Sequence, residues 1–209
     1  MNWIFETVFT FLQTDLTLST GLAIIGLTVL IRLLLLPISF PAIVQGIKQR
    51  QQLNKFKPQI DKLKQQYQSD PSLLSQKLMQ FYKDNSITFV NKTNLMNMLG
   101  QGITGFGMFQ FLNSTNLIGK FAWISDIAKS DVLLSVAVAL LTGLSMYLMP
   151  SAAESVNYLM LIVVSGVCLV SLLNFSSVIG LYWGTSTLVS TIQSFTANLI
   201  HSRKILSHG

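Results

Sequence analysis

Charged residues are scarce in this sequence of 209 residues, in which 11% are charged, 50% are hydrophobic and the mean hydropathy is +0.53. An ordinary soluble domain carries about 25% charged residues, and a soluble globule of this composition would expose more apolar surface than water tolerates. Intrinsic disorder is excluded because disordered chains are polar and charged. A single cysteine, Cys168, excludes a disulfide scaffold. The composition therefore indicates an integral membrane protein.

Groups that carry catalysis or bind metals are also few. The two histidines, His201 and His208, lie near the C-terminus, and no apolar run contains the paired carboxylates of a proton relay or a phosphate-binding loop. Glu154 and Asp126 are isolated loop carboxylates, which are more often solvated or capping than catalytic. We therefore expect a protein that is not an enzyme and has no cofactor and no metal site.

Long apolar runs dominate what remains, and a spanning helix needs about 20 mostly apolar residues. The sequence predicts an all-α integral membrane protein with five transmembrane helices, at residues 20–40, 94–113, 132–149, 157–173 and 178–200. Residues 1–19 precede the first span. Within them, residues 2–13 are too short to span and predict an interfacial helix, with Trp3 and the phenylalanines at the lipid boundary.

The charge distribution predicts the orientation. Segment 41–93 holds nine Lys and Arg against three Asp, a net +6 that equals the charge of the whole chain. Between apolar runs, such a segment indicates the cytoplasmic side of a membrane rather than a nucleic-acid surface. Residues 1–19 and the loop 114–131 are then extracytoplasmic, whereas the loop 150–156 and the tail 201–209 are cytoplasmic, so the predicted topology is N-out and C-in.

The cytoplasmic segment 41–93 predicts an antiparallel helical hairpin. Apolar residues recur at helical spacing in each arm, at Phe56, Ile60, Leu63 and Tyr67 and again at Leu74, Leu78 and Phe81. Between the arms, Asp70 suits an N-cap and Pro71 the first helical position, while Pro58 is expected to interrupt the first arm. Its lysines form either a solvated face that sets topology or a docking surface for acidic partners such as lipid headgroups or ribosomal RNA; they include Lys55, Lys57, Lys62, Lys64 and Lys77.

Arg32 is the most informative single residue. It follows Gly21 by eleven residues, or about 16 Å of helix, which places it near mid-membrane. An arginine facing lipid there costs about 2.5–3.5 kcal/mol on insertion scales, and no acidic residue lies in any predicted span to neutralise it. Snorkelling to an interface is the alternative, but both interfaces are distant. Arg32 therefore predicts a water-filled cavity that accepts an acidic group.

Polar residues on three predicted spans are placed to line such a cavity. Thr28 lies one turn before Arg32, and polar residues occupy arcs of about 80° and 100° on two other spans. These are Asn94, Asn97, Gln101 and Thr104 on 94–113, and Trp183, Thr187, Ser190, Thr191 and Ser194 on 178–200. Each set alone is typical of hydrogen bonding between packed helices; together with an unpaired arginine they predict a hydrophilic groove.

The layout resembles the YidC/Oxa family of membrane protein insertases. The resemblance rests on residues 28–32 followed by Pro37, on the stretches 57–60 and 78–83 of the hairpin, on the segment 123–131, and on residues 180–183 followed by Ser186, Thr187 and Gln193. The chain departs from the family pattern where Leu95 and Gln101 replace prolines, which marks it as a divergent, five-helix core member.

The resemblance implies an insertase and chaperone in the bacterial cytoplasmic membrane. Arg32 would attract an acidic residue of an incoming tail into the groove. The family motif also implies that Ser186 lines this groove. Nascent membrane proteins are then the substrates, and the ribosome, the signal recognition pathway and the Sec translocon are implied partners beside the phospholipid bilayer, with no specific nucleic acid sequence. The implied groove residues are Thr28, Arg32, Asn97, Gln101, Thr104, Trp183, Ser186, Thr187 and Ser190.

Three other functions are compatible with the residues. A small anion transporter or channel would use Arg32 as its anion site, although the sequence shows no inverted repeat. A non-catalytic assembly factor for membrane complexes would need no insertion activity. Lipid scrambling through the groove is the third.

Overall fold

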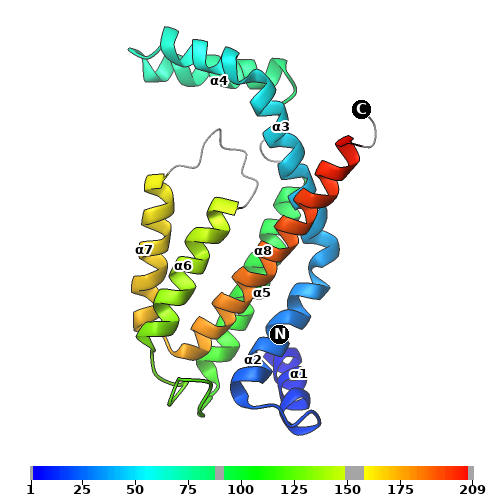
Figure 1. Ribbon diagram of the computed structural model, residues 1–209, viewed down its shortest axis with the longest axis vertical. Helices are drawn as coiled ribbons and strands as arrows, with labels where there is room; N and C mark the ends of the chain where they lie inside the picture. Colours follow the sequence, from blue (N-terminus) through cyan, green and yellow to red (C-terminus); the bar gives the residue numbers. More distant parts are fainter. Residues whose placement is uncertain (1, 88–91, 149–157, 207–209) are drawn as a thin grey trace.

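The structure is a computed structural model that describes residues 2–87, 92–148 and 158–206 (Figure 1). These residues form eight α-helices and, apart from one isolated bridge between Phe121 and Ile124, no β-structure. The helices are α1 (Asn2–Thr14), α2 (Thr20–Leu34), α3 (Leu36–Gln66), α4 (Pro71–Asp84), α5 (Lys92–Ser114), α6 (Val132–Leu148), α7 (Tyr158–Asn174) and α8 (Ser177–Leu206). The predicted loop 150–156 lies outside the described residues.

The all-α prediction is confirmed for the described part of the chain. The five segments expected to span a membrane correspond in position to α2 with the start of α3, and to α5, α6, α7 and α8. Among the described helices, none by itself combines the length and the hydropathy of a membrane span; α2 and α3 meet that test as a bent pair. The five-span topology and its orientation stay predictions.

A sharp break replaces the single helix predicted over residues 20–40. The helix α2 ends at Leu34, α3 begins at Leu36, and the two axes differ in direction by 66°. Pro37 stands in the first turn of α3, where its missing N–H leaves the carbonyl of Leu33 without the usual helical donor and its ring would clash with that carbonyl. The sequence predicted one transmembrane helix over residues 20–40; in the structure Pro37 divides this segment between two helices because it cannot continue the hydrogen-bond ladder of α2.

The opposite error concerns Pro58, which does not end the first arm of the hairpin. The helix α3 continues through Pro58 to Gln66, although it changes direction along its length (Figure 1). Leu53 and Ile60 on either side of this proline are buried against the second arm, whereas Pro58 itself points outward and is exposed. Packing on both sides therefore outweighs the lost hydrogen bond, and the helix is kept.

The helices α3 and α4 pack as an antiparallel hairpin at one end of the molecule (Figure 1). As the sequence predicted, Asp70 caps α4: its carboxylate accepts hydrogen bonds of 3.0 Å from the backbone N–H groups of Ser72 and Leu73. Between the arms, the rings of Phe56 and Phe81 meet edge to face with centroids 5.7 Å apart. The hairpin thus has a small core of its own.

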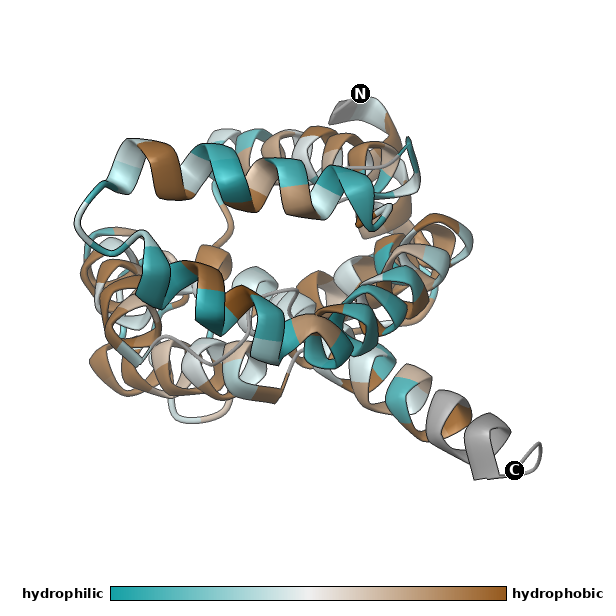
Figure 2. Ribbon diagram, turned by 90° about the horizontal axis from the view of Figure 1, so that it is seen from above, coloured by the Kyte–Doolittle hydropathy of each residue, from teal (hydrophilic) through white to brown (hydrophobic). Residues whose placement is uncertain are grey.

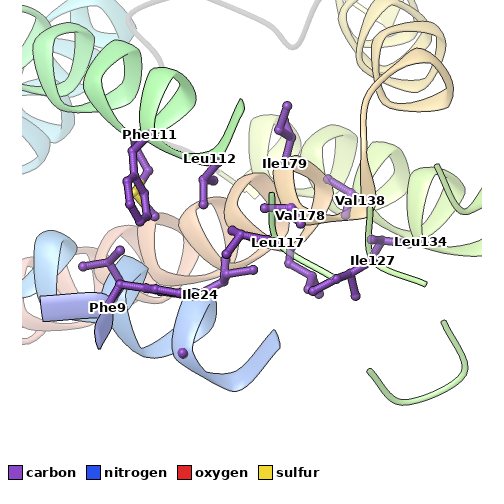
Figure 3. Packing of buried hydrophobic residues seen from close by; sticks show 14 of the residues in the cluster. Phe9, Ile24, Phe111, Leu112, Leu117, Ile127, Leu134, Val138, Val178 and Ile179 are labelled. Carbon is purple, nitrogen blue, oxygen red and sulfur yellow. The ribbon is translucent and has the colours of Figure 1, made fainter. Parts of the chain in front are cut away.

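The remaining helices form a bundle in which α6 packs between α7 and α8, and α8 also contacts α2, α3 and α5. Two glycines allow α8 to approach α6 closely. A Cβ on Gly180 would lie 2.8 Å from Leu134, and a Cβ on Gly184 would lie 2.9 Å from Val138. The main core cluster joins α1, α2, α5, α6, α7 and α8. Figure 3 shows part of it, with Val178 at the start of α8 between residues of α2 and residues of α6.

The end of the bundle opposite the hairpin is closed by α1 and by the 115–131 loop (Figure 1). Ile124 and Ile127 of this loop are buried in the main core, and the loop is tied to α8 by a 2.6 Å hydrogen bond from the Ser177 hydroxyl to the Lys129 carbonyl. Phe5 and Phe9 of α1 are also buried, against Phe111 of α5. The prediction that the phenylalanines of α1 lie at a lipid boundary was therefore wrong for these two, because α1 uses its aromatic face to cover α5.

The outer surfaces of the bundle are strongly apolar. Seen from the hairpin end, hydrophobic residues occupy outward as well as inward faces of the bundle helices, whereas the hairpin alternates hydrophilic and hydrophobic positions (Figure 2). On α7 this exposed surface comprises Tyr158, Leu159, Met160, Ile162, Val163, Val167, Val170 and Leu173. So many exposed apolar side chains on one helix mark a protein or membrane contact rather than a surface in water.

Candidate functional site

Arg32 lies in the last turn of α2 and reaches across to two other helices. Its Nε donates to the hydroxyl of Ser186 on α8 at 2.7 Å, and Nη2 contacts the same oxygen. Its Nη1 donates to Oε1 of Gln101 on α5 at 3.1 Å. The half-buried guanidinium thus joins α2, α5 and α8 through neutral acceptors. No acidic residue occurs in α2, α5, α6, α7 or α8 within their described bounds.

The amide of Gln101 extends this cluster along α5. Its Nε2 donates to Oδ1 of Asn97, one turn earlier, at 3.0 Å. Because the same amide accepts from Arg32 and donates to Asn97, its orientation is fixed by both neighbours. The structure therefore brings the predicted residues Arg32, Gln101 and Asn97 together. The guanidinium polarises the two amides, which form a chain of hydrogen bonds toward the start of α5.

Thr28 and Thr104 line the same site but do not hydrogen-bond to Arg32. The hydroxyl of Thr28, which is buried, donates to the carbonyl of Ile24 at 2.7 Å, and that of Thr104 donates to the carbonyl of Gly100 in its own helix. Such bonds satisfy a hydroxyl within one helix. These two predicted residues therefore line the site with hydroxyl groups that are satisfied within their own helices.

The residues of α8 divide between two faces, which the sequence did not separate. Ser186 faces Arg32, whereas Thr191 donates to the hydroxyl of Ser145 on α6 at 2.9 Å. At about 100° per residue, the hydroxyl stripe that contains Thr191 is centred about 90° away from the face of Ser186. Of the other predicted groove residues on α8, Trp183 packs against the main core, and Thr187 and Ser190 are half-buried. The hydrogen-bond partners of Arg32 are Ser186 and Gln101.

Tyr182 is a site residue that the sequence reasoning missed. It stands one turn before Ser186 on α8, and it borders the space beside Arg32. A Cβ on Gly105 of α5 would lie 3.5 Å from the hydroxyl of Tyr182. The spacing of four between Tyr182 and Ser186 is visible in the sequence, but the polar arc predicted on residues 178–200 did not include Tyr182.

The space beside Arg32 is small. Its volume is about 10 Å³, close to the minimum that holds one water molecule. It is lined by Thr28, Ile31, Arg32, Leu35, Gln101, Thr104 and Tyr182. The cluster is thus a polar site between three helices with room for about one water, and a larger ligand would have to displace side chains to enter.

The hairpin lysines do not share one face. At about 100° per residue, Lys55 and Lys62 lie on one side of α3, and Lys57 and Lys64 lie roughly opposite them. All four are exposed, and Lys77 on α4 is half-buried. The hairpin therefore presents positive charge to two sides.

Comparison with known proteins places this architecture in a family. Residues 11–204 match the family model described as "60Kd inner membrane protein". The chain is 28% identical over 191 residues to a protein of Clostridium perfringens named membrane protein insertase YidC, an alignment that covers 85% of this chain and 78% of that protein. A relative of the same name in Staphylococcus aureus (strain JH9) is 25% identical, over 88% of this chain and 68% of that protein. A third, in Clostridium tetani, is 30% identical, over 59% of this chain and 54% of that protein.

The family match includes every helix that contributes to the Arg32 cluster. It extends over nearly the whole chain and agrees with the resemblance that the sequence motifs indicated. The chain therefore belongs to the 60Kd inner membrane protein family, which confirms its resemblance to the YidC/Oxa insertases.

Proposed function

We propose that this chain is a membrane protein insertase and chaperone of a bacterial cytoplasmic membrane, and that Arg32 binds an acidic residue of the incoming segment. Family membership and the names of its bacterial relatives support the insertase activity. The observation that carries the role of Arg32 is its set of partners, which are the neutral groups of Ser186 and Gln101. The positive charge is thus held in place between three helices and is not neutralised.

An acidic side chain is the ligand that this arrangement favours. A carboxylate about 4 Å from the guanidinium would gain about 4 kcal/mol at an effective dielectric constant near 20, before its desolvation is subtracted. Two parallel N–H···O bonds match the geometry of arginine with a carboxylate. Because the cavity holds about one water, Ser186 and Gln101 would move aside as the carboxylate takes their place at Arg32.

The apolar exterior supports a location within lipid. The exposed residues of α7, and similar residues along α5 and α6, present a surface that a bilayer would solvate. An incoming segment that reaches Arg32 with its polar tail would pass its apolar part to the same lipid, and burial of that part would drive release. In this mechanism no covalent step and no nucleotide takes part.

The hairpin is the proposed contact with the machinery that delivers nascent chains. Its lysines project to two sides of α3, so one side can face anionic lipid headgroups while the other faces ribosomal RNA. Such contacts depend on charge and would weaken as salt rises. The ribosome is thus the partner best matched by the hairpin, and the signal recognition pathway and the Sec translocon remain partners implied by the family.

Reconstitution tests the proposal. The purified protein in liposomes receives a ribosome-released, single-spanning protein with a short acidic tail, and translocation of the tail is scored by protease protection. The comparison includes Arg32→Ala, Arg32→Lys and, as a matched loss of one positive charge, Arg50→Ala on the exposed surface of α3. We expect insertion by the wild type and by Arg50→Ala, reduced insertion by Arg32→Lys, and the lowest insertion by Arg32→Ala.

Two outcomes would contradict the proposal at different points. Insertion that is unaffected by Arg32→Ala would keep the activity and remove the role of Arg32. No insertion above empty liposomes would remove the activity itself, and an anion-dependent conductance in planar bilayers would then favour the channel.

A further inference from the structure

A second polar pair lies between the same two stretches of chain as Arg32 and Ser186. The hydroxyl of Ser39, on α3, donates to Oε1 of Gln193, on α8, at 3.4 Å. Both pairs are separated by 154 residues in the sequence, so the two stretches run parallel and in register despite the break at Leu35. Seven residues of helix place the second pair about 10 Å from the first, on the side of the hairpin.

Gln193 cannot satisfy its own amide at this position. Its side chain is only 8% exposed, and its Nε2 has no hydrogen-bond partner among the described residues. Ser39 is a single hydroxyl whose proton is already shared with the carbonyl of Leu36 at 3.5 Å. Exchanging the two ends of the amide would leave Oε1 without a donor instead, because Ser39 can serve only one end. In either orientation one end of a buried carboxamide is unpaired, at a cost that a native structure seldom retains without a use.

Two other buried side chains also lack partners, but they are less informative. The hydroxyls of Ser165 and Ser194 are unpaired in the described residues. A serine hydroxyl within a helix can rotate onto the carbonyl one turn earlier, as Thr28 does. A glutamine amide, at the end of a longer side chain with two donors and an acceptor, requires a partner from elsewhere.

We propose, on the basis of the insertase function proposed above, that Gln193 and Ser39 form a second binding station that takes a backbone peptide group of the incoming segment. A carboxamide presents an N–H and a C=O side by side, and each residue of an extended chain presents its own N–H and C=O along one edge, so the amide pairs with any residue of such a chain. A segment travelling from the hairpin end meets this station about 10 Å before Arg32. Gln193 therefore holds the main chain irrespective of sequence, and Arg32 selects the acidic side chain.

This division predicts different substrate dependence for the two residues. Unpaired peptide groups are the main source of unfavourable free energy when any segment enters an apolar region. Because Gln193 would pair with such a group in every substrate, its loss affects the insertion of all substrates. Loss of Arg32 affects substrates with acidic tails. A buried water at Gln193 is the competing explanation, and it predicts no dependence of insertion on this residue.

The test uses the full chain in liposomes and two single-spanning substrates whose tails differ only in Asp against Asn. Gln193→Met keeps the length of the side chain and removes both polar ends. We expect Gln193→Met to lower insertion of both substrates by about 3- to 10-fold, the equivalent of about one hydrogen bond. Arg32→Met should lower insertion of the acidic substrate alone. Thermal unfolding of Gln193→Met should be unchanged or shifted upward, because an unpaired buried amide is removed.

A cross-link locates the contact directly. The double variant Cys168→Ala, Gln193→Cys carries a cysteine at the proposed station and none at position 168. It is mixed with substrates that are stalled at successive lengths and carry one cysteine each, and disulfide formation is then induced with an oxidant. Disulfides at several consecutive tail positions, whatever the neighbouring sequence, support a main-chain station. Unchanged insertion by Gln193→Met, or a loss confined to the acidic substrate, would overturn the inference while the wild type still inserts. Failure of the wild type to insert either substrate would instead overturn the proposed function.

Discussion

Ser186 offers the sharpest test of the contact between Arg32 and α8. Ser186→Ala removes the oxygen that both Nε and Nη2 of Arg32 contact, while Ser194→Ala, two turns later on the same helix, removes a hydroxyl without a partner among the described residues. The two serines are 5% and 2% exposed, respectively. The substitutions are thus matched in chemistry, helix and burial, and differ in the contact with the guanidinium.

The expected magnitudes follow from the hydrogen bonds. A hydrogen bond to a charged group contributes about 1.5–3 kcal/mol, and the half-buried position of Arg32 argues for the lower end of that range. Ser186→Ala should therefore lower the free energy of unfolding by about 1.5 kcal/mol, or the melting temperature by about 3–6 °C for a chain of this length. Ser194→Ala should change stability by about 0.5 kcal/mol or less, since it removes at most a hydrogen bond within its own helix.

Thermal unfolding of the purified protein in detergent measures both variants side by side. A double-mutant cycle with Arg32→Met separates the contact from other effects of the alanine, and the coupling between Arg32 and Ser186 should be about 1 kcal/mol or more. Equal shifts for Ser186→Ala and Ser194→Ala, together with zero coupling, would refute the view that Ser186 holds the guanidinium.

Four further substitutions test helix packing and helix capping. Gly184→Ala places a Cβ 2.9 Å from Val138 and should destabilise the bundle by about 1–3 kcal/mol, whereas Gly166→Ala, with no atom within 4 Å, should be neutral or stabilise by about 0.5–1 kcal/mol in the same unfolding assay. Asp70→Ala removes the N-cap of α4 and should cost about 1 kcal/mol, seen as faster amide exchange in the first turn of that helix. Ile60→Ala, at a fully buried position, should cost about 2–5 kcal/mol of stability. Amide hydrogen exchange should then be faster throughout the hairpin while the amides of the bundle stay protected. Equally fast exchange in both parts would argue against a separate hairpin core.

The sequence predicted the polar centre because its signal is local and chemical. An arginine among apolar residues needs neutral acceptors when acids are absent, and the amides on 94–113 share one helical face. Gln101 and Asn97 were found for that reason. Asp70 was found because capping depends on neighbouring residues in the chain.

The misses arise where tertiary contacts decide. The hydroxyl stripe on α8 was clear, but periodicity does not say which neighbour a face meets, and part of that stripe faces Ser145 rather than Arg32. Pro37 and Pro58 have the same local chemistry, yet one breaks a helix and the other does not, because Leu53 and Ile60 hold α3 together around Pro58. The burial of Phe5 and Phe9 depends likewise on α5 lying beside α1.

The central claim, that Arg32 recognises an acidic residue of the incoming segment, is tested most directly by varying the charge of the substrate and of the protein together. Insertion is measured for tails that carry no, one or two Asp residues, with the wild type and with Arg32→Met in the same liposomes. The account predicts that insertion by the wild type is higher for the acidic tails, and that Arg32→Met abolishes this difference while neutral tails are inserted equally by both proteins. The same preference for acidic tails in both proteins would contradict it.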